Sequence, residues 1–334
     1  MALQLAVMSQ PAVPDRRTDS TPEGGQCWPA AWLVGDKRQD WENRGMELRW
    51  DDPEAPWWAK LRRAKSHISE VRQRVDVLQA AEPWSIQREP AGPDGWAYRF
   101  RVHKPVPADL AAATGDAVAN MRAALDTIAY ELARHHAGTM SDAEERATFF
   151  PICENKAAFE KFFQHPLRSN LYGDTERRAL QCVQPFARAD EMREHGIEPS
   201  TDPKSDLLTD HAYALNTIWN IDKHRRLPEL AWAAEGPVWF EGVTGCRWRG
   251  HVTGVTLLPD GGVLGELHGP AGSGRPQVEP HYTIDLVLTD DPSPYPSLLV
   301  ERLEWLHQSL TGWVVPRIFI VADGNPPPMM IGGG

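Results

Sequence analysis

The stretch GDAVANMRAALDTIAYELARHH, residues 115–136, is the longest helical pattern in this chain and decides its fold. Apolar side chains recur in it at spacings of three and four: Val118, Met121, Leu125, Ile128 and Leu132. Such a repeat forms a continuous seam along one face of an α-helix. Alanines surround the seam on several sides, and small residues let neighbouring helices approach closely. We therefore expect this helix near the middle of a helical bundle.

The same helix carries polar residues that solubility alone does not require: Asp116, Asn120, Arg122 and Asp126. At about 100° per residue, Asn120 and Arg122 lie on opposite shoulders of the apolar seam. Arg122 and Asp126 are one turn apart and close enough to pair. This set forms half of a candidate site, with Arg122 and Asp126 as candidate catalytic residues and Asp116 and Asn120 as candidate ligand-binding residues.

A second helix, predicted over residues 205–226, is the best partner of the first. Asp222 falls on its apolar stripe, together with Leu215 and Ile218. An unpaired carboxylate is costly to bury, so Asp222 needs a basic or donor partner, and Arg122 is a candidate. The alternative is that Asp222 lies in a fraying last turn, just before Pro228, and stays hydrated.

The end of this second helix supplies the other half of the candidate site. His224 joins Asp222 as a candidate catalytic residue. The remaining polar side chains of the helix are candidate ligand-binding residues: Asn216, Asn220, Lys223 and Arg225. Asp222 and His224 are two residues apart and point to different sides of a helix, so they form a poor metal pair. We expect no metal and no cofactor.

A third helix is predicted over residues 56–78, where apolar residues again recur at spacings of three and four. Its other faces carry six basic residues between positions 60 and 74, against the single acid Glu70: Lys60, Arg62, Arg63, Lys65, Arg72 and Arg74. This charge is typical of a solvated helix face. The alternative is a surface that faces phosphate groups.

The remaining patterns complete an α+β fold. Residues 84–103 predict a β-hairpin, because two strand-like runs flank the turn sequence Ala-Gly-Pro-Asp-Gly at 91–95. Short helices are expected near 157–164 and 174–183, with irregular chain at 187–204. Residues 227–290 read as an antiparallel sheet of about four strands, followed by a helix at 296–310 and a strand at 314–321.

Four regions follow from these patterns. Residues 1–50 form a loosely ordered arm rich in Trp and Pro, and residues 51–226 form a bundle of four or five helices with the inserted hairpin. Residues 227–323 form the smaller antiparallel β region with its C-terminal helix, and residues 324–334 form a disordered tail. The sequence leaves open whether the bundle and the β region share one core.

Composition limits the function classes. The formal net charge of −11 argues against a general nucleic-acid or anionic-membrane binder, although a local basic face is compatible with an acidic total. No window approaches the ~20 apolar residues of a membrane span, and the N-terminus lacks the features of a secretion signal. The four cysteines are far apart in sequence, as expected for reduced structural thiols. We expect a cytoplasmic protein without a membrane partner.

Four motifs carry a resemblance to a known family: GDAVANMRAALD at 115–126, FPI at 150–152, QPF at 184–186 and NIDKHR at 220–225. In this order they resemble a family of uncharacterised proteins of actinobacteria and their phages. The resemblance spans roughly residues 55–226 and implies a shared helical core. It brings no known function with it.

A looser similarity is to HEPN-type helical bundles, many of which are RNases or nucleotide-binding partners in toxin–antitoxin and phage-defence systems. Active members carry an Arg and, after four to six residues, a His on one helix, doubled across a dimer interface. Here Arg122 matches the Arg, but Thr127 stands after the four-residue gap and cannot shuttle a proton near neutral pH. The similarity implies a homodimer through the central helices.

Three hypotheses follow. The first, which we favour, is a non-catalytic binding or accessory protein of a bacterial or phage defence-type system, directed at RNA, a nucleotide or a protein partner. The second is a metal-independent RNase or nucleotide transferase built on Arg122, Asp126, Asp222 and His224. The third treats the polar set as a buried structural network, with function elsewhere in the chain. Whether the protein is an enzyme stays open at this stage.

Overall fold

The computed structural model describes residues 52–194, 211–223, 227–240, 245–250, 252, 254–278, 280–289, 291 and 297–325. All of them belong to one compact unit that spans residues 48–334. The arm predicted for residues 1–50 lies outside the described residues, as do positions 326–334 of the predicted tail.

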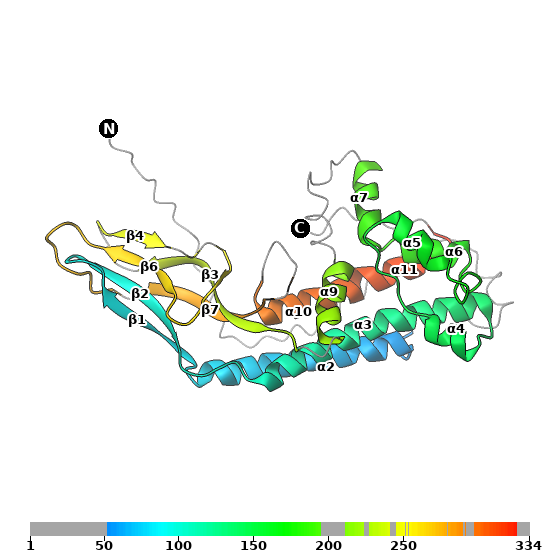
Figure 1. Ribbon diagram of the computed structural model, residues 1–334, viewed down its shortest axis with the longest axis horizontal. Coiled ribbons are helices and arrows are strands. Elements are labelled where there is room, and N and C mark those ends of the chain that lie inside the picture. The colour runs from blue at the N-terminus through cyan, green and yellow to red at the C-terminus, as the bar shows by residue number, and fades with distance from the viewer. Residues whose placement is uncertain are drawn as a thin grey trace. The chain divides into compact units, whose positions relative to one another are not determined.

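The fold is mixed α+β, as the sequence predicts (Figure 1). The helices are α2 (Pro56–Ala80), α3 (Ala108–Ala137), α4 (Asp142–Ala147), α5 (Lys156–Phe163), α6 (Asp174–Gln181), α7 (Pro185–Glu194), α9 (His211–Lys223), α10 (Leu299–Ser309), the π-helical turn η2 (Leu310–Val314) and α11 (Val315–Ala322). The strands are β1 (Trp84–Pro90), β2 (Gly95–Val102), β3 (Leu230–Phe240), β4 (Arg247–Gly250), β5 (Thr256–Leu257), β6 (Val263–His268) and β7 (Pro280–Leu288).

Helices α2 and α3 run antiparallel and side by side along much of their length (Figure 1). The apolar seam predicted for residues 115–136 is completely buried, and so is the apolar stripe of α2. Helix α3 begins after Pro107 and ends at Gly138, whose φ of +73° favours glycine. It is 30 residues long, so it extends well before the predicted stretch.

The predicted hairpin is confirmed, but it is part of a larger sheet. Strands β1 and β2 pair in antiparallel register from Trp84 opposite Val102 to Pro90 opposite Trp96. The free edge of β2 then pairs with β6, giving a four-stranded sheet of order β1-β2-β6-β4. A second sheet has the order β5-β3-β7, and its pairs are also antiparallel. The single sheet predicted for residues 227–290 is therefore two sheets, one completed by the hairpin.

Two segments differ from the sequence-based expectation. Residues 187–194, which belong to the region 187–204 expected to be irregular, lie in helix α7. Residues 314–321, predicted as a strand, belong to the continuous helical segment η2–α11. The run VVPRIFIV is rich in β-branched residues, which favours a strand in isolation. It is buried on several faces as a helix, and a short, mostly apolar run has no periodicity that distinguishes the two structures.

One hydrophobic core joins the helices to the sheets. Its buried residues come from α2, α3, α5, α6, α9, α10, α11 and from strands of both sheets. At the C-terminal end, Phe319 of α11 stacks on Trp57 of α2 with ring centroids 5.0 Å apart. The boundary expected at residue 226 therefore does not separate two cores.

Candidate functional site

Arg122 and Asp126 of α3 form the ion pair that their spacing predicts. Arg122 Nη2 lies 3.0 Å from Asp126 Oδ1. The side chain of Arg122 is only 5% exposed, whereas that of Asp126 is 31% exposed. Burial lowers the pKa of the Arg122 guanidinium, and the charge and hydrogen bond of Asp126 act in the opposite direction. The attraction of Asp126 thus offsets part of the cost of burying the Arg122 cation.

Both side chains also hold the backbone of one residue, Phe150. Arg122 Nη2 donates to the Phe150 carbonyl oxygen at 2.7 Å. The Phe150 amide donates to Asp126 Oδ1 at 2.9 Å. Trp219 of α9 covers the other part of the cation, with its ring centroid 5.1 Å from Arg122 Cζ. We call this arrangement of Arg122, Asp126 and Phe150 the Phe150 clamp.

The segment that follows Phe150 is held in the same way from the turn between α6 and α7. Gln184, which is buried, donates from Nε2 to the carbonyl oxygens of Pro151 (2.8 Å) and Leu180 (2.9 Å). Its Oε1 accepts a hydrogen bond from the Cys153 amide at 2.9 Å. The motif residues of α3, the FPI segment and QPF therefore meet in one network. Its hydrogen bonds satisfy backbone groups of a segment that forms no ladder of its own.

Arg122 has unused hydrogen-bonding capacity within this network. Its Nε and Nη1 atoms are buried and have no hydrogen-bond partner among the residues that the structure describes. Thr127, at the position where active HEPN-type members carry His, donates its hydroxyl to the Ala123 carbonyl oxygen at 2.8 Å. The Thr127 hydroxyl is therefore bonded within α3.

Among the described side chains, none of the other candidate residues forms a hydrogen bond or ion pair with Arg122. Asp116 is exposed, and Asn120 donates from Nδ2 to the Asp116 carbonyl oxygen at 2.8 Å. Asn216 and Asn220 are half-buried on α9. Asp222 and Lys223 end α9, and their side chains are not described; His224 and Arg225 lie outside the described residues. Their predicted roles stay predictions.

A buried carboxylate lies near the C-terminal end of α3. Glu176 Oε1 and Oε2 each lie 3.6 Å from an imidazole nitrogen, of His135 and of His136 respectively. Glu176 Oε2 also accepts from the Gly173 amide at 3.1 Å, which caps α6. Within the described ranges, no group of three or more His, Cys, Asp or Glu side chains could hold a metal ion. The arrangement is that of a helix cap.

The basic face of α2 divides into two halves that the sequence does not distinguish. In the second half, Arg72 pairs with Glu304 of α10 at 2.7 Å, and Arg74 pairs with both Glu70 and Asp109. In the first half, four cations form no ion pair with any residue that the structure describes. We call them the α2 basic cluster: Lys60, Arg62, Arg63 and Lys65. Arg62 donates only to a neutral acceptor, the Pro53 carbonyl oxygen, at 2.5 Å.

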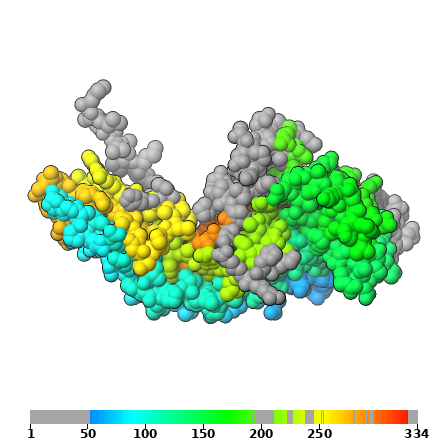
Figure 2. All heavy atoms as spheres, viewed as in Figure 1, coloured from blue at the N-terminus to red at the C-terminus, as the bar shows by residue number. Residues whose placement is uncertain are grey.

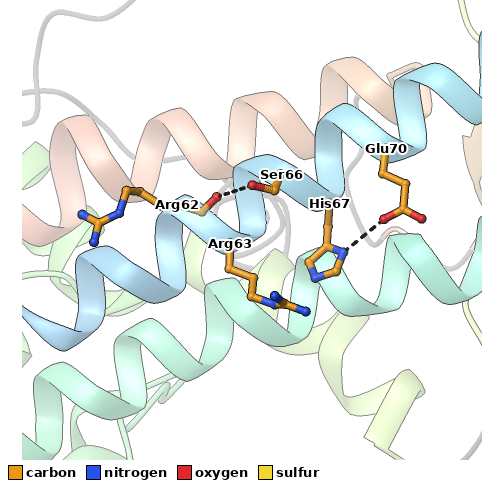
Figure 3. A pocket seen from close by; sticks show the side chains of 5 residues that line it. All are labelled: Arg62, Arg63, Ser66, His67 and Glu70. Atoms are coloured by element: carbon orange, nitrogen blue, oxygen red, sulfur yellow. Dashed lines mark hydrogen bonds and ion pairs between the residues drawn. The ribbon is translucent and has the colours of Figure 1, made fainter.

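The α2 basic cluster borders a shallow groove of about 410 Å³ (Figure 3). The groove is lined by Arg62, Arg63, Ser66, His67 and Glu70. Figure 3 shows Arg63 and His67 extending to one side of α2 and Arg62 to another. The first part of α2 is blue in the space-filling view, where its atoms are visible along the lower edge (Figure 2). The lining combines the guanidinium groups of Arg62 and Arg63 with the carboxylate of Glu70, which already pairs with Arg74 and His67.

Comparisons with protein-family models, curated proteins and solved structures find no match for this chain. A search for membrane-spanning helices among the described residues finds no candidate of sufficient length and hydropathy.

Proposed function

We propose that this protein is a non-catalytic binding protein that holds RNA by its phosphate backbone through the α2 basic cluster. The observation that carries the proposal is the absence, among the described residues, of any acidic partner for Lys60, Arg62, Arg63 and Lys65. Four exposed cations within two turns of one helix form a local positive field. The backbone of a nucleic acid carries one negative phosphate per nucleotide, and a local positive field attracts this row of charges.

The state of the Phe150 clamp favours binding over catalysis. A catalytic Arg must reach the charge that develops in the transition state, and a catalytic carboxylate must reach the proton that moves. Arg122 is buried against Trp219 and bonded to a backbone carbonyl, and Asp126 is engaged with Arg122 and a backbone amide. These contacts support the hypothesis that the polar set of α3 is a structural network.

The choice of RNA rests on the HEPN-type resemblance, whose members include RNases and nucleotide-binding partners. The same resemblance is the ground for proposing a homodimer and an accessory role in a bacterial or phage defence-type system. The total charge of −11 means that the positive field is local. Binding is therefore expected at the α2 basic cluster and is expected to weaken steeply with salt.

The proposal is tested by measuring RNA affinity as a function of salt. A short, labelled single-stranded RNA is titrated with wild-type protein, with Arg63→Gln/Lys65→Gln and with the control Arg72→Gln. Each lost phosphate contact reduces the slope of log K against log salt by about 0.7 for a single strand, so the double variant should lose about 1.4. Arg72→Gln should keep the wild-type slope, because Arg72 is already paired with Glu304.

Two results would contradict the proposal. One is the absence of RNA binding by the wild type at low salt. The other is binding with the same salt slope in wild type and in Arg63→Gln/Lys65→Gln. Wild-type melting temperatures are expected for both variants, because these side chains are exposed and changes there have small effects on stability.

A further inference from the structure

Phe149 is an exposed aromatic residue in a fixed position. It leaves 42% of its surface exposed, whereas its neighbour Phe150 is completely buried. The Phe150 clamp bonds both the amide and the carbonyl of Phe150, so the backbone that carries Phe149 is held from both sides. A group of exposed apolar side chains often marks an interaction site, whereas an isolated one is common on protein surfaces. The Phe150 clamp, whose Arg122 and Asp126 were candidate catalytic residues, therefore holds the backbone next to the Phe149 ring.

A cation lies over the same ring. Arg168 Cζ is 5.2 Å from the ring centroid of Phe149 and 4.1 Å from that of Phe162 in α5. The two phenyl rings meet edge to face, with centroids 5.1 Å apart. Within the described ranges, the Arg168 guanidinium has no ion pair and no hydrogen bond, and its Nε is buried without a partner. The aromatic rings help to stabilise its positive charge, which stays unpaired within the described ranges and is available to an anion.

We propose that Phe149 and Arg168, supported by Phe162, form a platform that takes an unstacked base and its adjoining phosphate from single-stranded RNA. A phenyl ring offers a face to any nucleobase, and the stacked guanidinium offers both a plane for stacking and donors for a phosphate oxygen. Bases in a duplex are already stacked and cannot use such a platform. The inference rests on the proposed function, and it adds a preference for single strands.

The platform and the α2 basic cluster occupy the same end of the α2–α3 pair. Arg74 pairs with Asp109, which sets the antiparallel alignment of the two helices. Asp126, which holds the segment of Phe149, lies 17 residues beyond Asp109 in α3. Trp57, just before the α2 basic cluster, lies 17 residues before Arg74 in α2.

The test compares single-stranded RNA with its duplex, using the same labelled strand with and without its complement. Phe149→Leu keeps an apolar side chain but removes the ring, and Phe149→Trp restores an aromatic face. Loss of one stacked base is expected to weaken single-strand binding roughly 5- to 150-fold in Phe149→Leu, and Phe149→Trp should recover it. The duplex affinity and the salt slope should not change in either variant. Leu167→Ala, an exposed apolar neighbour without a ring, is the matched control.

The outcomes separate this inference from the proposed function. If Phe149→Leu binds single strands as tightly as the wild type, while Arg63→Gln/Lys65→Gln still loses salt slope, the platform is wrong and the α2 basic cluster stands. If single-strand binding falls in Leu167→Ala as much as in Phe149→Leu, stacking is not the cause and the platform is again wrong. If the wild type binds neither RNA form at low salt, both proposals are wrong.

Discussion

Arg122 makes its contacts inward, toward the backbone of the FPI segment and the ring of Trp219. A buried guanidinium keeps its charge only where partners compensate for lost hydration. Asp126, the Phe150 carbonyl and Trp219 supply that compensation. Arg122 and Asp126 bond both backbone groups of Phe150, which is buried next to the exposed Phe149. At the scale of single residues, Arg122 and Asp126 of α3 therefore hold the backbone of the FPI segment in place.

Arg122→Ala should consequently lower stability rather than remove an activity. The variant leaves the Phe150 carbonyl without its donor and Asp126 without its cation, at an expected loss of roughly 3 kcal/mol in the free energy of unfolding. Urea denaturation measures this loss. Asn120→Ala, at a half-buried position whose side chain bonds only within the same helix, is the control and should change stability by no more than about 0.5 kcal/mol. Wild-type stability in Arg122→Ala, together with loss of an RNA-cleaving activity, would instead support the RNase hypothesis.

Helix α9 is held to the C-terminal helices by an aromatic cluster around His211. The His211 ring lies 4.0 Å from that of Trp305 in α10 and 6.2 Å from that of Trp313 in η2, centroid to centroid. Arg302 and Arg317 lie over the two indole rings. The π-helical turn η2 lies between α10, which carries Trp305, and α11. A π-turn rotates the residues that follow it about the helix axis, so it changes which side chains of α11 face a neighbouring element. At the scale of elements, a neutral His211 joins α9, α10 and η2.

Acid should weaken this cluster. Burial, with the nearby charges of Arg188 and Arg302, lowers the pKa of His211 from 6.5 to about 4. Below pH 6.5 the unfolded chain binds a proton that folded His211 excludes, so the contribution to stability is complete above pH 6.5 and declines toward pH 4. Between pH 7 and pH 5 the expected loss is about 2 kcal/mol. Urea unfolding at both pH values should show a smaller loss in His211→Phe; an equal loss in the two proteins would rule out this role for His211.

The two halves of the chain depend on each other at the scale of the whole molecule. His307 Nε2 of α10 lies 3.0 Å from the Leu61 carbonyl oxygen of α2, and Arg317 of α11 donates to the Cys182 carbonyl oxygen at 3.0 Å. Strand β6 completes the hydrogen bonding of β2. Every one of these contacts crosses the position where the sequence suggested a boundary, near residue 226.

A fragment of the chain that ends at residue 226 should therefore fail to fold cooperatively. It would expose the faces of α2, α3 and α6 that α10 and α11 cover, and the edge of β2 would lose its partner. Circular dichroism during urea unfolding would show a broad transition of low slope for the fragment and a cooperative one for the full chain. A cooperative transition of the fragment, with a slope in proportion to its length, would show instead that residues 51–226 form an independent domain.

The sequence by itself determined the long helices, the hairpin and the mixed α+β class, because helical and strand periodicity are local properties of the chain. It also predicted the Arg122–Asp126 pair, since residues one turn apart in a helix are neighbours wherever the helix lies. Tertiary structure decided which cations of α2 find acidic partners, because Glu304 and Asp109 come from other helices. It also decided the helical state of residues 314–321 and the joining of β2 to β6. Those outcomes depend on contacts between residues far apart in the chain, and local periodicity carries no information about them.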